Sequence, residues 1–273
     1  MQEYERHRHL PDTDRLNILV GTILLAFALA HFIRLPVRQL SIQLPGLYLA
    51  INFGVQQLVA LLVALLTATG ADWLLRDHPH RGKHRLVEHW LLPGLTAWAI
   101  SLPLLQLPLS PIWWIGFASG GILLILVLIA EYIVLDPDDV RHQPAAAGLT
   151  AVSFALFLVL VVGLRFASSR LFLLLPSLGL VSFLVSLRAV HLRLHNRWAF
   201  QEAGLVALVT IQIASALHYW PISPVSFGLA LLAPAYALTN LLGNLAEGIP
   251  LRRSIVEPVV VLVLIWGTAL LIH

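Results

Sequence analysis

The chain contains no cysteine and, among its 273 residues, only one lysine, Lys83. The absence of cysteine excludes disulfides, thiolate metal sites and cysteine nucleophiles. Charged residues make up only 11% of the chain, whereas 59% of the residues are hydrophobic; soluble domains carry about 25% charged residues. The composition therefore predicts an integral membrane protein. The net charge of +3 is small and reflects membrane topology rather than nucleic-acid binding.

Long segments without Asp, Glu, Lys or Arg determine how many helices cross the membrane. A spanning helix requires about 20 mostly apolar residues, because it rises about 1.5 Å per residue through a hydrocarbon core about 30 Å thick. Two of the uncharged segments, 90–130 and 203–246, are long enough to cross twice, and each contains a Pro-X-Ser-Pro motif, at Pro108 and Pro221 respectively. Proline interrupts a helix because it has no N–H to donate. The sequence predicts an all-α, polytopic transmembrane helix bundle of about nine spans: 16–33, 47–75, 89–107, 111–135, 148–165, 170–194, 199–220, 224–247 and 255–272.

The distribution of charge orients this bundle. With the N-terminus in the cytoplasm, the inner loops carry 13 Lys and Arg residues and the outer loops carry 4, while all fourteen carboxylates fall on the inner side. This bias follows the positive-inside rule. We therefore expect a cytoplasmic N-terminal tail, residues 1–15, and a single transmembrane helical domain, residues 16–273, with its C-terminus outside. The expected location is the cell (inner, cytoplasmic) membrane, where basic inner loops meet anionic lipid headgroups.

The longest outer connection, residues 34–46, has the alternation typical of a strand. Leu40, Ile42 and Leu44 alternate there with the polar residues Ser41 and Gln43. Apolar residues with a period of two indicate an extended segment rather than a helix. We expect this segment to cover the outer face of the bundle.

Three charged residues near inner helix ends differ in their local pairing. Asp72 has Arg76 one turn later on the same helix, which is a favourable spacing for an ion pair. Glu131 lies at a helix C-terminus, where the helix dipole disfavours a carboxylate, and no basic residue lies one turn away on either side. Arg188 likewise has no acid one turn away. Because a buried unpaired charge is costly, we expect Glu131 and Arg188 to find partners on other helices or to face water.

The eighth predicted span places several polar residues on one face. Asn240, Asn244 and Glu247 are spaced four and three residues apart, and Tyr236 lies one turn deeper. These residues and the two charges above predict a cytoplasm-facing polar pocket for a ligand. The alternative is a structural network that locks the helix ends together. The candidate pocket residues are Glu131, Arg188, Tyr236, Asn240, Asn244 and Glu247.

Other motifs favour structural roles. His191 and His195 have the spacing of a metal-binding pair, but arginines surround them and no third ligand is near. Asp136, Asp138 and Asp139 adjoin a proline, which is typical of a solvated turn. The sequence therefore predicts no metal and no cofactor. Small residues in the fourth span predict close helix packing: Gly116, Ser119, Gly120 and Gly121.

Three classes of function agree with these features. The first, which we favour, is that the protein binds or moves a lipid or small amphiphile through the cytoplasm-facing pocket. The second is an accessory or structural subunit that contacts another membrane protein, and the third is an enzyme acting on a lipid-linked substrate. Polar residues near the middle of the spans are neutral, which argues against carboxylate-driven ion coupling: Gln56, Gln57, Gln212 and Ser215.

Overall fold

The chain folds into an all-α, polytopic bundle with one short hairpin in the part that the structure describes. The computed structural model describes residues 11–32, 38–44, 47–53, 55–76, 86–167, 170–194 and 198–272. Eight of the described helices are long and apolar enough to cross a membrane. The chain is therefore a multi-pass membrane protein, as its composition predicts. It divides into two compact units, unit 1 (Met1–Asp139) and unit 2 (Val140–His273).

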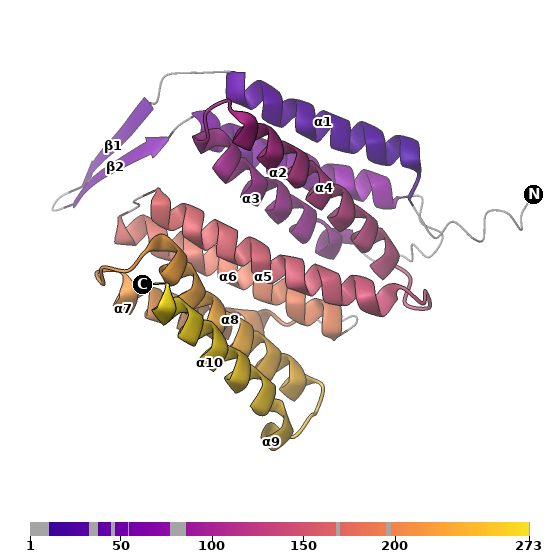
Figure 1. Ribbon diagram of the computed structural model, residues 1–273, viewed down its shortest axis with the longest axis vertical. Helices are drawn as coiled ribbons and strands as arrows, with labels where there is room; N and C mark the ends of the chain where they lie inside the picture. Colours follow the sequence, from indigo (N-terminus) through magenta and orange to yellow (C-terminus); the bar gives the residue numbers. More distant parts are fainter. Residues whose placement is uncertain are drawn as a thin grey trace, which may run out of the picture. The chain divides into compact units, whose positions relative to one another are not determined.

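Unit 1 is built from four helices around an apolar core. In Figure 1, α1 contacts α2 and α4, and α3 packs between the same two neighbours. Ile23, Ala97 and Leu124 are fully buried at the centre of this core. The elements are α1 (Thr13–Phe32), α2 (Val55–Leu75), the 3-10 helix η2 (Leu86–His89), α3 (Leu91–Gln106) and α4 (Pro111–Val134).

The hairpin joins α1 to α2 at one end of unit 1 (Figure 1). Strand β1 (Arg38–Leu44) pairs antiparallel with strand β2 (Leu47–Phe53). The register sets the apolar residues Leu40, Ile42 and Leu44 of β1 opposite apolar residues of β2, for example Leu40 opposite Ile51. The predicted extended segment is thus confirmed.

The predicted second span, 47–75, begins too early. Residues 47–53 form strand β2, and α2 begins at Val55. The segment Leu47–Phe53 has the same alternation as β1 and carries no charge. The absence of charge therefore does not distinguish this strand from the apolar helix that follows.

Both Pro-X-Ser-Pro motifs separate two helices, as predicted. Ser110 caps α4 by accepting the N–H of Trp113 at 3.4 Å, and Pro111 follows at the first helical position. Ser223 caps α8 in the same way, with the N–H of Ser226 at 3.1 Å. Serine before a helix and proline at its first position are both favoured, because the first N–H groups of a helix have no partner within it.

Helix α3 is apolar but is not among the eight helices long enough to cross a membrane. Its 16 residues extend about 24 Å, less than the hydrocarbon core of a bilayer at about 30 Å. The indole of Trp113 donates to the Leu104 carbonyl at 3.0 Å, which fastens the start of α4 to the end of α3.

Small residues of α4 allow close packing in unit 1. A Cβ atom built on Gly120 would lie 2.7 Å from Cγ2 of Ile100 on α3, and one built on Gly121 would lie 3.2 Å from Cδ1 of Leu24 on α1. These two glycines confirm the predicted close contact. At Gly116 the corresponding distance, to Leu104, is an ordinary 3.5 Å.

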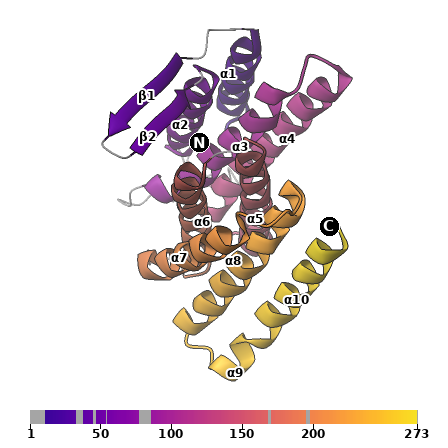
Figure 2. The same ribbon diagram turned by 90° about the vertical axis from the view of Figure 1, so that its left-hand side faces the viewer.

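Unit 2 packs α5, α6, α7 and α8 together, and α10 lies against α8 (Figures 1 and 2). Figure 2 shows the short α9 at the turn between α8 and α10. Helix α10 is peripheral, and its buried residues are Pro258 and Ala269. The elements are α5 (His142–Phe166), α6 (Leu171–Arg193), α7 (Phe200–Leu217), α8 (Pro224–Ala246), α9 (Leu251–Ser254) and α10 (Val256–Leu271).

Candidate functional site

The side chain of Arg193 places a positive charge at the end of unit 2 where α6 and α8 end and α10 begins. It is the last residue of α6 and is half-buried. Its Nη1 donates to Oδ1 of Asn244 on α8 at 3.1 Å. The guanidinium lies over Gly243, where an added Cβ would come within 3.3 Å of Nη1. The missing side chain at Gly243 therefore makes room for the cation.

Tyr236 and Asn240 continue this polar group along α8, because they lie four residues apart on the face that also carries Asn244. Asn240 is buried, and its amide donates to the Tyr236 carbonyl at 3.1 Å. We call the group formed by these residues the Arg193 cluster: Arg193, Tyr236, Asn240 and Asn244.

An aromatic contact lies beside the Arg193 cluster. The ring of Phe154, on α5, meets the ring of Tyr236 edge to face, with centroids 5.0 Å apart. Phe154 is buried and Tyr236 is half-buried. Tyrosine in such a position offers an apolar ring on one side and a hydroxyl on the other, which suits the boundary between lipid chains and headgroups.

Three of the six predicted pocket residues come together here: Tyr236, Asn240 and Asn244. Glu247 follows α8 directly and is exposed, and its N–H donates to the Gly243 carbonyl at 3.0 Å. Arg188 lies on α6 and is 1% exposed. The sixth residue, Glu131, belongs to unit 1.

Sequence reasoning did not include Arg193 in the pocket. Arg193 fits the positive-inside rule, so it did not stand out. A useful signal was Gly243, which lies between Asn240 and Asn244 and leaves space on the polar face of α8.

Polar contacts continue from the Arg193 cluster into the interior of unit 2. Thr239 on α8 donates its hydroxyl to Ser186 on α6 at 3.1 Å. Further along α6, Ser182 donates to Thr210 on α7, also at 3.1 Å. All four residues are buried. These two hydroxyl pairs join α6 to α8 and to α7.

In unit 1, the buried Glu131 contacts an imidazole. Its Oε2 lies 2.7 Å from Nδ1 of His89, which precedes α3. Glu131 is 1% exposed and His89 7%. On the other side of the ring, Nε2 lies 3.7 Å from Oε1 of Glu88. The expectation that Glu131 finds a partner on another element is confirmed, and His89 had not been singled out as that partner.

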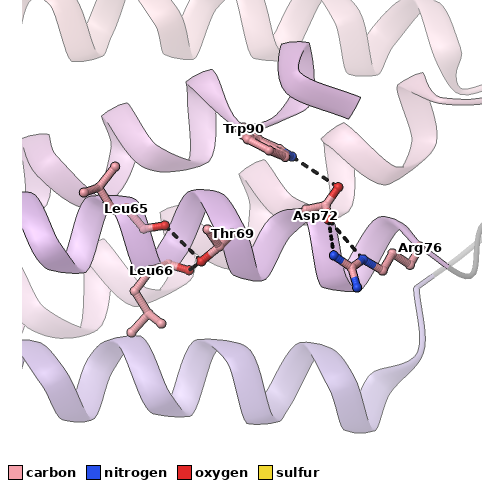
Figure 3. Close-up of polar contacts among 6 residues, drawn as sticks. All are labelled: Leu65, Leu66, Thr69, Asp72, Arg76 and Trp90. Atoms are coloured by element: carbon pink, nitrogen blue, oxygen red, sulfur yellow. Dashed lines mark hydrogen bonds and ion pairs between the residues drawn. The ribbon is translucent and has the colours of Figure 1, made fainter. Parts of the chain in front are cut away.

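Asp72 connects α2 with the residue before α3 at the same end of unit 1. Figure 3 shows its carboxylate between Arg76 and Trp90. Oδ2 accepts Nε and Nη2 of Arg76 at 3.0 and 2.8 Å, and Oδ1 accepts the Trp90 indole at 3.4 Å. The predicted pair between Asp72 and Arg76 is confirmed. Nearby, the guanidinium of Arg15 on α1 lies 5.1 Å above the ring of Trp73 on α2.

The candidate metal ligands adopt other roles. The Asp138 N–H donates to Oδ1 of Asp136 at 3.0 Å, which confirms a turn at this acidic segment. His191 packs its ring on Trp198 with centroids 5.1 Å apart, while His195 lies outside the described residues. Within the described ranges, three or more His, Asp or Glu side chains do not gather in a metal-binding arrangement.

Comparison with known protein families gives one match. Residues 35–272 match the model of a family described as Protein of unknown function (DUF5656). The chain belongs to this family. The matched region begins after α1 and includes the hairpin and every helix from α2 to α10. No curated protein and no solved structure matches the chain.

Proposed function

We propose that this DUF5656 protein binds a lipid or small amphiphile at the Arg193 cluster, and holds or moves it at the cytoplasmic face of the cell membrane. The observation that carries the proposal is the meeting of a cation from α6 with a face of α8 that carries two amides and a phenol, at one end of unit 2. Polar groups at a helix end, beside apolar helix surface, are suited to a ligand with a polar head and an apolar body.

The predicted topology supports a position of the Arg193 cluster on the cytoplasmic side of the membrane. The loops next to the C-terminal ends of α6 and α8 are inner loops in the arrangement that satisfies the positive-inside rule. Arg193 lies at a helix C-terminus, where the dipole favours a cation, and Arg252 and Arg253 on α9 are exposed near the same loops. A basic surface of this kind attracts anionic headgroup atoms.

Native mass spectrometry of the purified protein tests the proposal. We expect the wild-type protein to retain a defined phospholipid, and the Arg193→Gln variant to lose most of it. Arg170→Gln is the matched control, because it removes the same charge from an exposed position at the opposite end of α6. Equal retention by the wild-type protein and Arg193→Gln would contradict the proposal, as would adducts that merely follow the composition of the bulk membrane.

A structural role is the second candidate, because Arg193 and Asn244 of the cluster are also bonded to each other. In an accessory subunit this contact would fix α6 against α8 for contact with a partner protein. Arg193→Gln would then lower the melting temperature without changing the retained lipid. Measuring melting temperature and retained lipid on the same samples separates the two functions.

A further inference from the structure

We propose that His218 is a proton-binding site, and that protonation of its ring releases a link between three helices of unit 2. The link lies at the end of unit 2 where α6 begins, opposite the Arg193 cluster. Its other members are Arg165, in the last turn of α5, and Phe227, in the first turn of α8. The inference is independent of lipid binding at the Arg193 cluster.

The guanidinium of Arg165 contacts both of these residues. Its Nη2 donates to the backbone carbonyl of His218 at 2.9 Å, and its Nη1 lies 3.2 Å from Nδ1 of the His218 ring. Its Cζ lies 4.8 Å from the centroid of the Phe227 ring, which is fully buried. Because α5 and α7 each pack against α6 and α8, Arg165 links two helices that pack mainly on shared neighbours.

The contact between the two side chains requires a neutral imidazole. A guanidinium carries only N–H donors and stays charged, so Nδ1 of His218 must be the acceptor. Protonation would add an N–H to Nδ1, directed at the N–H of Arg165, and would set two positive charges against each other across 3.2 Å. Acid therefore replaces a hydrogen bond by repulsion between like charges.

The acids of unit 2 lie too far away to compensate this charge. They are Glu202, Glu247 and Glu257, at the start of α7, the end of α8 and the start of α10. These are the helix ends opposite the one at which His218 lies. A nearby carboxylate would hold Arg165 in place after the imidazole takes up a proton, and unit 2 does not supply one at this end.

The other groups around His218 do not compensate the charge either. On the same segment, the exposed Tyr219 meets the imidazole edge to face, with ring centroids 4.9 Å apart. Helix α6 begins after the exposed Arg170, which is a further cation. The first turn of α8 and the last turn of α10 carry no charged residue. Histidine changes its charge between about pH 5 and 8, so the link responds to pH in this range.

The test measures the melting temperature of the full-length protein in detergent at about pH 7.5 and about pH 5.0, on both sides of the range in which histidine titrates. His218→Asn keeps an acceptor that cannot be protonated, because Oδ1 of asparagine and Nδ1 of histidine are bonded to the same side-chain carbon. Acid should lower the melting temperature of the wild-type protein by about 2–4 °C more than that of His218→Asn, the effect of losing roughly one hydrogen bond.

His31→Asn is the matched control, because His31 is also a half-buried histidine in the last turn of a helix. Its ring packs on Trp113, with centroids 5.1 Å apart, rather than on a cation. This variant should keep the acid sensitivity of the wild-type protein. Arg165→Gln removes the charge that opposes protonation, so its melting temperature should depend on pH as weakly as that of His218→Asn, whatever its value at neutral pH.

Hydrogen exchange locates the effect. After correction for the intrinsic exchange rates, amides in the last turn of α7 should exchange several-fold faster in acid in the wild-type protein and not in His218→Asn. Equal acid sensitivity of the wild-type protein, His218→Asn and Arg165→Gln would overturn the proposal. Exchange at this turn that does not change with pH would overturn it as well, because the acid sensitivity would then arise elsewhere.

Discussion

The two units differ in how they satisfy buried hydroxyl groups. In the described part of unit 1, Thr67, Thr96 and Ser101 donate to carbonyls of their own helices, at 2.7, 2.7 and 2.6 Å. In unit 2, the hydroxyl of Thr239 reaches Ser186 on another helix as well as its own helix carbonyl. These hydroxyls of unit 1 are therefore satisfied within single helices, whereas unit 2 also has hydroxyl pairs that join neighbouring helices in its interior.

The charged residues of the two units differ in how far they are buried. In unit 1, Glu131 is buried against His89, an arrangement that fastens α4 to the start of α3. In unit 2, Arg193 is half-buried and Glu257 is exposed, so both remain accessible. Burial favours a structural role for the unit 1 pair, and accessibility favours a ligand site in unit 2.

The largest expected effect is on the side of the membrane that each loop occupies, because this side depends on whether the short helix α3 of unit 1 crosses. The chain has no cysteine, so single cysteines can be introduced without background. Leu109, between α3 and α4, is 48% exposed, and Val140, between α4 and α5, is 95% exposed. If α3 crosses the membrane, a membrane-impermeant maleimide should label Leu109→Cys only from outside and Val140→Cys only from the cytoplasm. With the N-terminus in the cytoplasm, labelling from the opposite sides would show that α3 does not cross.

The next effect is on the buried pair of unit 1. Replacing Glu131 by alanine leaves His89 without the contact at 2.7 Å and should lower the free energy of unfolding by about 3 kcal/mol, the usual cost of removing one member of a buried pair. The exposed Glu247→Gln should change it by less than about 0.5 kcal/mol. Unfolding in mixed detergent micelles measures both. A loss below about 1 kcal/mol for Glu131→Ala would mean that the pair does not fasten unit 1.

Close helix packing in unit 1 should respond to one added methyl group. Gly120→Ala would place a Cβ 2.7 Å from Ile100 and should destabilise the protein by about 1–2 kcal/mol through overpacking. Gly116→Ala is the control on the same helix, because its added Cβ would meet Leu104 at 3.5 Å. The two variants should therefore differ when unfolded under identical conditions. Equal stability would show that α3 and α4 can separate at no cost.

The smallest effect belongs to the interhelical hydroxyls of unit 2. A double-mutant cycle of Thr239→Val and Ser186→Ala should give a coupling of about 0.6 kcal/mol, the average for hydrogen bonds between membrane helices. Thr96→Val in unit 1 supplies the comparison, since its hydroxyl donates within its own helix and should show no coupling to Ser186→Ala. Zero coupling between Thr239 and Ser186 would remove the distinction between the two units.

Most helices could be predicted from the sequence, because the length of an uncharged segment and the positions of paired prolines are local features. It failed at β2, where Leu47–Phe53 is apolar enough to resemble the start of a span. It found Tyr236, Asn240 and Asn244 because they share one helix face. It missed Arg193 and His89 because their contacts join different elements, and the pairing of elements cannot be read from spacing along the chain.

The most direct test of the difference between the units is the amount of phospholipid retained per chain by two matched variants. Arg193→Gln removes a charge from the end of unit 2, and Asp72→Asn removes one from the end of unit 1, where it contacts Arg76 and Trp90. We predict that Arg193→Gln loses most of the lipid retained by the wild-type protein and that Asp72→Asn retains it. Retention by Arg193→Gln, or an equal loss in both variants, would contradict a ligand site in unit 2.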